Sequence, residues 1–486
     1  MKNRLMIVKV SILSVALLWF AGAGRAQDTQ PPQEDKPKPA AKTYGPIGSE
    51  DQDQDQTPAD TLQPDERPLT GIQQPTVGTP LERHSYWVPG VSYYNFLQSN
   101  GNTQGGGSSW SSTNYIAGNL SLLENWSRSQ LMLNYSGGGA FSTDSTVGNN
   151  WFQQFNATQA FNWERWQLTL LDEFDYLPQS QFGFGAGTGL MSPGIGGTLG
   201  VPSTGLGGQF NPGQSIFSAI GPRYTNTAGV QLNYVLSKRS SLTFGGIYSI
   251  LRFTDPGNIE SNDYLGNVGY NYQVSRSDSI GVVYRYSAYH YIGTPQAIGD
   301  QSIQLAYGRK ITGRLALQLS GGPEITHLRI PQGTGNQTRY VAGTGSATLT
   351  YTLAKGSFSV NYFHGVSPGS GVFLGANTDQ VTATGSRRLT RVWSGNANLG
   401  FSRSENLSGQ NQNSGQIGLN SNYDTLYGGA SLARALGRNA NFSLGYTAYY
   451  EQASGTVCTG ISCAPSFTTH QISIGLSWHA HPFVLR

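Results

Sequence analysis

Charge, cysteine and long apolar runs are all scarce in this chain. Charged residues make up 12% of its 486 residues, and only two residues are cysteine. That charged share is about half of what soluble globular proteins usually carry. No apolar run of transmembrane-helix length follows the N-terminal segment. A chain with 64 glycines, 26 tyrosines and a net charge of +3 matches neither a disordered protein nor a nucleic-acid binder with a basic patch.

The N-terminal segment, residues 1–26, has the organisation of a secretory signal peptide. Lys2, Arg4 and Lys9 form a basic start, residues 10–20 form a short apolar core, and the sequence AGAGRAQ supplies small residues for cleavage. An uncleaved membrane anchor is the alternative interpretation. The segment therefore predicts export from the cytoplasm.

Residues 27–85 have no apolar periodicity. They contain ten prolines and eleven acidic residues, in stretches such as QDTQPPQEDKPKPAAK. Such a segment cannot bury enough apolar surface to order itself, so it predicts a disordered periplasmic tail. A plain solvated spacer and a tether to a partner or the cell wall are the two roles considered.

From Trp87 onward the dominant period is two, which is the period of a β-strand. Apolar side chains occupy one face and small polar ones the other. In 441–448, for example, the apolar face carries Phe442, Leu444, Tyr446 and Ala448, and the other face carries Asn441, Ser443, Gly445 and Thr447. Helical spacing does not fit this pattern.

Counting such units gives about 18 strands, and the connections between them alternate in length. Short turns such as ENWSR, WERW, SKRS, SRSD, ITGR, LAKG, LTRV and LGRN separate longer loops rich in Gly, Ser, Asn and Pro. A soluble sandwich gives no reason for every second connection to be tight, whereas a transmembrane barrel does. We therefore predict an all-β fold for 86–486, a transmembrane antiparallel up-and-down β-barrel of about 18 strands.

The tryptophans support this prediction. Six of the eight that follow the signal segment lie near a short turn or a barrel terminus, where an aromatic girdle meets the membrane interface. These six are Trp87, Trp126, Trp163, Trp166, Trp393 and Trp478.

In this pattern the chain resembles bacterial outer-membrane β-barrel proteins of the porin-like type. Its stretches GRKITGRLALQLSGGPE (308–324) and GSGVFLGA (369–376) are similar to those of uncharacterised outer-membrane barrels. The resemblance implies a site in the cell outer membrane, with membrane lipid, small polar solutes and the barrel-assembly machinery as partners. It implies no cofactor and no nucleic acid, and a homo-oligomer is possible because porin trimers are familiar. Trp478 or Phe483 would supply the terminal aromatic residue that assists assembly.

Strand parity nominates charged residues for the inner face, since charge on the lipid face at mid-depth is destabilising. The pore-lining candidates are Glu173, Asp175, Arg285, Glu324 and Arg388. A selectivity filter and plain solvated lumen charges are both open interpretations. Asp172 has lipid-facing parity, and a β-bulge near Leu171 is our explanation.

Two loops carry further predictions. Residues 177–222 are uncharged and hold thirteen glycines, and by resemblance to porins this loop folds into the pore, with a mobile lid or disordered cap as the alternatives. Cys458 and Cys463 lie in the last external loop and are predicted to form a disulfide, because exported proteins oxidise paired cysteines. Free thiols or a metal pair are the alternatives.

These features predict a channel for passive diffusion of small polar solutes rather than an enzyme. A structural or surface-display barrel with an occluded lumen is the alternative. A barrel enzyme acting on lipids ranks third, on the proximity of Ser367 to His364. No metal site is predicted, because His479 and His481 have no third ligand nearby.

Overall fold

In the computed structural model, the described part of the chain is one β-sheet that closes on itself. The structure describes residues 85–100, 109–143, 148–177, 223–254, 259–329, 337–368, 374–407, 422–454 and 466–485. No helix among these residues is long and apolar enough to span a bilayer. The signal segment, the acidic tail, most of loop 177–222 and the two cysteines lie outside the described residues, so the predictions about them stay predictions.

Eighteen long strands and one short one make up the sheet. They are β1 (Ser85–Asn100), β2 (Ser109–Asn125), β3 (Ser129–Ser142), β4 (Asn149–Asn162), β5 (Trp166–Leu177), β6 (Arg223–Ser237), β7 (Ser240–Phe253), β8 (Ser261–Gln273), β9 (Asp278–Tyr291), β10 (Ala297–Lys310), β11 (Leu315–Arg329), β12 (Gln337–Leu353), β13 (Gly356–Ser367), β14 (Ala376–Arg388), β15 (Trp393–Asn406), β16 (Asn422–Leu436), β17 (Ala440–Ser454), β18 (Ser466–His479) and β19 (Phe483–Leu485).

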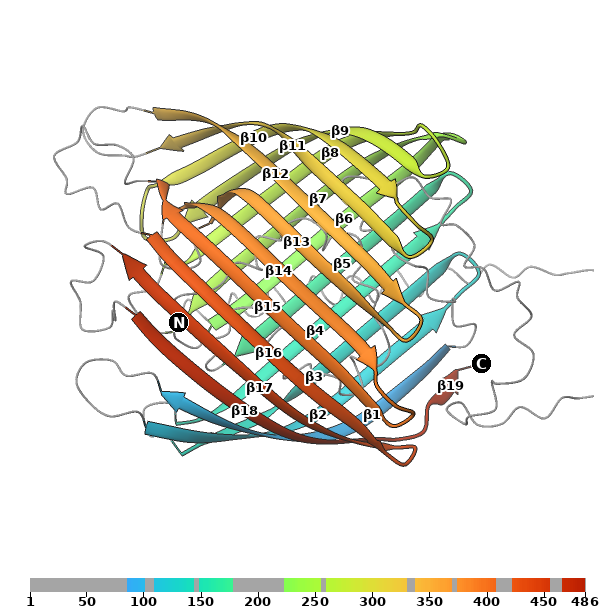
Figure 1. Cartoon of the computed structure of the whole chain (residues 1–486), viewed down its shortest axis with the longest axis vertical. Helices are drawn as coiled ribbons and strands as arrows, with labels where there is room; N and C mark the ends of the chain where they lie inside the picture. Colours follow the sequence, from blue (N-terminus) through green and yellow to red (C-terminus); the bar gives the residue numbers. More distant parts are fainter. Residues whose placement is uncertain are drawn as a thin grey trace, which may run out of the picture. The chain divides into compact units, whose positions relative to one another are not determined.

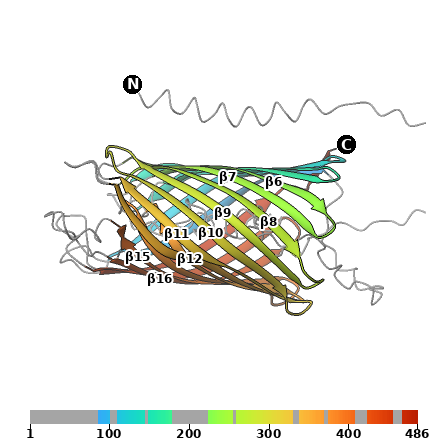
Figure 2. The same ribbon diagram turned by 90° about the horizontal axis from the view of Figure 1, so that it is seen from above.

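Each strand pairs antiparallel with the next one along the chain, and β1 pairs with both β2 and β18, which closes the barrel. The strands run obliquely around it (Figure 1; Figure 2). Closure matters because a membrane-spanning sheet has no water to satisfy a free edge. The prediction of an all-β antiparallel barrel of about 18 strands is thus confirmed.

The two faces of the wall differ in character, as the period of two predicts. On β9, Ile280 and Tyr284 are exposed on one face, whereas Ser279, Arg285 and Ser287 are buried on the other. The register carries this alternation from strand to strand, so Tyr284 lies beside Val268 of β8. We assign the apolar face to lipid and the polar face to the lumen, because apolar side chains gain nothing from facing an aqueous interior.

The connections alternate between short and long, as predicted. Every second connection has four residues or fewer, as between Ser237 and Ser240, and all of these turns lie at the barrel end where β1 begins and β18 ends. We take this end as periplasmic. The six tryptophans named above lie at this end, and Trp166 stacks against Tyr234 with ring centroids 4.1 Å apart.

The pairing along β1 continues past the end of β18. β19 pairs with Ser85–Trp87 of β1, in continuation of the pairing between β1 and β18. Phe483 stacks on Trp87 at 4.8 Å between ring centroids. The residues that follow Trp478 therefore extend the wall at the periplasmic rim.

The predicted bulge near Leu171 is wrong. Pairing of β5 with both β4 and β6 runs through Asp172 without a register shift. Asp172 keeps its lipid-side parity, and it is 4% exposed because neighbouring side chains cover it. Its carboxylate accepts a hydrogen bond of 2.8 Å from Asn226 Nδ2. A hydrogen-bonded partner on the same face thus replaces the parity shift that we expected.

The face assignment predicts unequal costs for an arginine at two adjacent positions. Leu399, 55% exposed on the outer face near the middle of β15, should lose about 2–4 kcal/mol of unfolding free energy on Leu399→Arg, since the charge enters lipid. Asn398→Arg, one residue away on the inner face, is the matched control and should cost much less. Urea titration of the refolded barrel in lipid vesicles measures both. Equal losses would contradict the assignment of the two faces.

Candidate functional site on the inner wall

The five nominated residues all lie at inner-face positions of the register, but in three different places. Arg285 on β9 and Glu324 on β11 meet in one buried cluster. Glu173 and Asp175 lie half-buried on β5 toward the extracellular end. Arg388 is the last residue of β14 and is exposed at the periplasmic mouth, opposite Ser394. Whether these side chains line a conducting path stays a prediction.

Arg285, Asp300 and Glu324, from three consecutive strands, form what we call the ion cluster. One guanidinium nitrogen of Arg285 lies 3.6 Å from a carboxylate oxygen of Asp300 and 3.6 Å from one of Glu324. All three side chains are almost fully buried, at 3%, 0% and 1% exposure. Thr326 Oγ1 donates to Asp300 at 3.2 Å, and the guanidinium lies over the Phe363 ring at 5.9 Å from its centroid. Buried charges of this kind persist only when paired.

A second group of charges lies on the inner face of β5 and β6. Asp175 accepts a hydrogen bond of 3.0 Å from Gln154 Nε2. Arg223, the first residue of β6, is 3% exposed and interacts electrostatically with Asp175 and Tyr449. The Tyr449 hydroxyl in turn donates to Glu451 on β17 at 2.6 Å. Because β6 and β17 are not neighbours in the sheet, this electrostatic interaction joins residues from separate parts of the inner face.

The extracellular end of β13 leaves the barrel wall. Pairing between β12 and β13 covers nine residue pairs and stops at Gly345 and His364. Beyond that point, within the described residues, Gln337–Thr344 of β12 pair only with β11. β13 itself stays paired with β14 up to Ser367. The end of the β13–β14 hairpin has therefore separated from β12.

We call Val366–Pro368 and Leu374–Gly375 the hairpin end. It reaches the inner faces of β9 and β10, which lie three and four strands away. The Tyr289 hydroxyl donates to the Val366 carbonyl at 3.3 Å, and the Tyr291 hydroxyl donates to the Pro368 carbonyl at 3.1 Å. Gln296 Nε2 donates to the Leu374 carbonyl at 3.0 Å. Three hydrogen bonds from β9 and from the β9–β10 connection thus hold the hairpin end inside the barrel.

Apolar packing accompanies these bonds. The buried side chains around the hairpin end form one cluster, which we call the inner apolar cluster: Tyr289, Tyr291, Ile298, Leu328, Val366 and Leu407. Ile298 and Leu328 are 1% and 0% exposed although they face the lumen. Burial of several such side chains is worth a few kcal/mol, by about 25 cal/mol per Å² of apolar surface. The hairpin end is therefore packed against the wall as well as hydrogen-bonded to it.

Glycines make this close approach possible. A Cβ on Gly365 would lie 2.6 Å from Thr344 Oγ1 and 3.5 Å from a carboxylate oxygen of Glu324. Gly375 has φ +90°, and a Cβ there would overlap Ile298 Cδ1. Only glycine adopts that backbone conformation without strain. The hairpin end thus lies directly against the ion cluster and the inner apolar cluster.

The inner wall is rich in buried polar atoms without a protein partner. Among the described residues, all such side-chain atoms but one, on Asp424, belong to inner-face positions. Examples are the hydroxyl of Thr243 and both polar atoms of the Asn271 amide, on side chains with 0% exposure. A polar group without a hydrogen bond costs free energy unless water reaches it. The wall therefore has the chemistry of a surface that contacts water.

The remaining sequence candidates are not brought together. His364 lies on the outer face, where Nδ1 is 2.8 Å from an Asp379 carboxylate oxygen. Ser367 lies on the inner face and is hydrogen-bonded to Thr378 at 2.8 Å. A serine and a histidine on opposite faces of one strand cannot act as a nucleophile and its base. The structure offers no dyad at these two positions.

Sequence analysis missed several charged residues of the inner wall: Arg223, Asp263, Asp300 and Glu451. The parity rule applied to the ends of the strands would have found Asp263 and Glu451. Asp300 was missed because its strand was expected to begin at residue 301, whereas β10 begins at Ala297. Nothing local in the sequence signals that Arg223 interacts electrostatically with Tyr449 of β17.

Searches against protein-family models and against curated proteins found no match. Solved barrels are similar in fold. OccK2 (OpdF) of Pseudomonas aeruginosa matches with a TM-score of 0.41 and 8% identity over 81% of this chain and 98% of that one. A BenF-like porin from Pseudomonas fluorescens Pf-5 matches with 0.38 and 8% over 82% and 99%. OccAB4 of Acinetobacter baumannii matches with 0.39 and 10% over 83% and 100%. In architecture the described part of the chain is a closed antiparallel β-barrel of 18 long strands.

Because Arg285 is the one cation of the ion cluster, its removal should strongly destabilise the barrel. Arg285→Met should lower the unfolding free energy by about 3–5 kcal/mol, because it leaves two buried carboxylates without a counter-charge. Urea titration in vesicles measures the loss. The triple variant Arg285→Met, Asp300→Asn, Glu324→Gln is the control and should recover much of it, since no uncompensated charge remains. An Arg285→Met barrel as stable as the wild type would show that the three groups do not act as a unit.

Proposed function

We propose that the barrel is an outer-membrane channel through which small polar solutes diffuse passively. The observation that carries this proposal is the polar composition of the inner face, where side chains such as Thr243, Asn271 and Ser287 alternate with the apolar side chains of the outer face. A barrel of about 18 strands is wide enough to hold an aqueous path. Assembly by the barrel-assembly machinery and formation of a homo-oligomer remain predictions.

The hairpin end is the proposed constriction. It leaves the wall at β13 and reaches over the inner faces of β9 and β10, held by the hydroxyls of Tyr289 and Tyr291. Sequence analysis assigned this role to loop 177–222, most of which lies outside the described residues, and that role stays a prediction. In a wide barrel, an inward segment of this kind sets both the size limit and the gating of the path.

A second candidate function is a structural or display barrel with an occluded lumen. The burial of lumen-facing side chains favours it: Phe152, Tyr289 and Leu328 are at most 1% exposed. An apolar aromatic cluster on β1–β4, in which Phe152 packs edge-on against Tyr115 at 5.3 Å, is similarly covered. The two candidates differ in one measurable property, which is ion conductance.

Ion conductance therefore tests the channel proposal. Removal of the Tyr289 and Tyr291 hydroxyls tests whether the hairpin end is the constriction. In a planar bilayer we expect single-channel steps from the wild type and a higher or more often open conductance from Tyr289→Phe with Tyr291→Phe. Each lost hydrogen bond releases the hairpin end by about 1 kcal/mol. Tyr284→Phe with Tyr286→Phe, on the lipid face of the same strand, is the matched control and should leave conductance unchanged.

Folded protein without conductance in any variant would support the occluded barrel instead. If the two tyrosine variants have identical conductance, the barrel is still a channel, but the hairpin end is not its constriction.

We further propose that the channel prefers cations. At inner-face positions away from the periplasmic mouth, the described strands carry more carboxylates than guanidinium groups. The carboxylates belong to Glu173, Asp175, Asp263, Asp300, Glu324 and Glu451, and the guanidinium groups to Arg223 and Arg285. A wall of low dielectric constant that carries a net negative charge concentrates cations in the path that it surrounds.

The reversal potential under a tenfold KCl gradient measures this preference. We expect the wild type to favour K⁺ over Cl⁻, and Glu173→Gln with Asp175→Asn to reduce the ratio, because these two carboxylates are the more accessible ones. Asp379→Asn removes a charge from the outer face and should change nothing. An anion-selective wild-type channel would reject the preference.

A further inference from the structure

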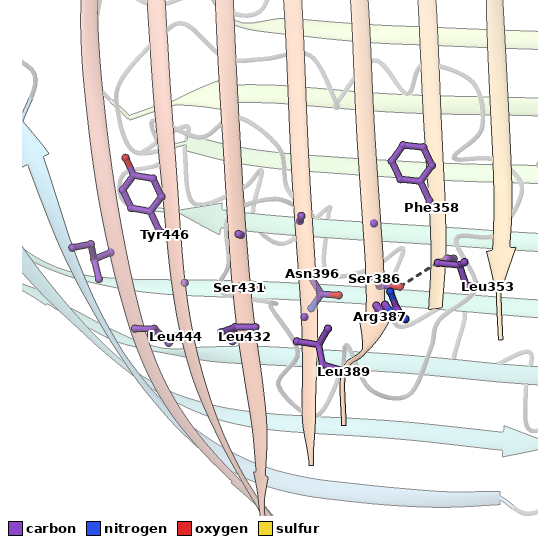
Figure 3. Close-up of a pocket in the computed structure, with 17 residues that line it drawn as sticks. Leu353, Phe358, Ser386, Arg387, Leu389, Asn396, Ser431, Leu432, Leu444 and Tyr446 are labelled. Carbon is purple, nitrogen blue, oxygen red and sulfur yellow. Dashed lines mark hydrogen bonds between the residues drawn. The ribbon is translucent and has the colours of Figure 1, made fainter. Parts of the chain in front are cut away.

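The outer surface of the barrel carries a groove over β13–β18, at the periplasmic half. It has a volume of about 730 Å³ and is open along the lipid side. One row of directly opposite outer-face residues crosses it: Phe358, Gly385, Ala397, Ala430, Tyr446 and Ile472. Figure 3 shows Phe358 and Tyr446 standing on either side, with the strands between them almost bare.

The hollow arises from the small residues in that row. Gly385, Ala397 and Ala430 occupy three neighbouring strands, so no large side chain stands on the outer face between the rings of Phe358 and Tyr446 in that row. Since neighbouring strands are about 4.8 Å apart, the floor between the two rings is about three strands wide. Leu432 and Leu444 border it toward the periplasm. The floor and walls are almost entirely apolar, which suits hydrocarbon chains.

A cluster of cations lies at the periplasmic end of the groove. Arg387, one row below Gly385 on the same face, is exposed. Arg434, two residues beyond Leu432 on the same face, is also exposed, and its guanidinium lies 5.5 Å from the centroid of the Trp393 ring. Lys355, Arg388, Arg391 and Arg438 lie in or beside the adjoining short turns.

No acidic residue accompanies these cations. Between Lys355 and Tyr450 the only acidic residues are Asp379, Glu405 and Asp424, all in the extracellular halves of their strands. Some other periplasmic turns carry acidic residues: Arg309 pairs with Asp278 at 3.7 Å, and the turns ENWSR and WERW each carry a glutamate. The turn SKRS also carries only cations, Lys238 and Arg239. What distinguishes the groove is the number of cations, since six of them lie at or beside its periplasmic end.

We propose that this groove binds an anionic glycerophospholipid of the periplasmic leaflet. Its acyl chains lie in the hollow between Phe358 and Tyr446, and its phosphate lies against Arg387 and Arg434. Guanidinium groups bind phosphate oxygens in a bidentate manner, and basic surface residues at the interface attract anionic lipid. The charge complementarity favours a lipid over a second copy of the barrel, because two identical basic rims would repel each other.

Native mass spectrometry of the detergent-purified full-length protein tests this proposal, with dioleoyl phosphatidylglycerol and dioleoyl phosphatidylethanolamine as probes. We expect the wild type to retain phosphatidylglycerol preferentially. Arg387→Gln with Arg434→Gln should reduce that retention by about tenfold or more. Lys238→Gln with Arg239→Gln, at a different periplasmic turn, is the matched control and should retain it as the wild type does.

The hollow itself is tested by Ala397→Trp, which fills the floor while leaving both arginines in place. This variant should lose retention of phosphatidylglycerol as well, whereas binding to the basic rim alone would survive it. Equal retention of the two lipids by the wild type, or by the wild type and the double arginine variant, would overturn the proposal. A defined oligomer that carries no lipid would overturn it too and would assign the groove to a second copy of the chain.

Discussion

Everything in this structure depends on one constraint, which is that each backbone N–H and C=O at the depth of the hydrocarbon must find a partner within the protein. The sheet closes through β1 and β18 for this reason. Within the described residues, the separation of β12 from β13 obeys the same constraint. β12 and β13 stay paired for nine residues from the periplasmic turn, close to the 9–11 residues that a tilted strand needs to cross a bilayer. The hairpin end leaves the wall only above that height, where water can satisfy the freed edge of β12.

The same constraint explains why the inner wall holds charges that a soluble core would exclude. Because lipid, and not a packed interior, receives the apolar side chains, the inner face is free to carry polar residues. Arg285, Asp300 and Glu324 are almost fully buried. The segment of β13 that leads into the hairpin end places Phe363 over the guanidinium and Gly365 beside Glu324. The inward path of this hairpin and the ion cluster are therefore packed against each other.

Local sequence pattern predicted the strands, their faces and the short turns, because each of these follows from a period of two and from turn composition. It failed at Asp172, where the cost of a lipid-side carboxylate is offset by Asn226 on the neighbouring strand and not by a bulge. The sequence pattern placed Arg285 and Glu324 each on the inner face. That the two side chains lie next to each other depends on the strand register across two hairpins, which the pattern does not give. The inward hairpin end was not predictable, because Tyr362–Ser367 keep the period of two while the strand leaves the wall.

Glycines help to shape the outer surface of the barrel. A glycine in a strand interior weakens the sheet and usually marks a place where something approaches the backbone closely. At Gly375, directly before β14, the approaching group belongs to this chain, namely the side chain of Ile298. At Gly385, on the lipid face, the side chain of Phe358 is 3.5 Å from the position of a Cβ, and the space beside it is open. Since the neighbouring strands add only Ala397 and Ala430 to that row, the local loss of packing needs a partner from the membrane to offset it. The basic rim beneath the row indicates that this partner carries negative charge.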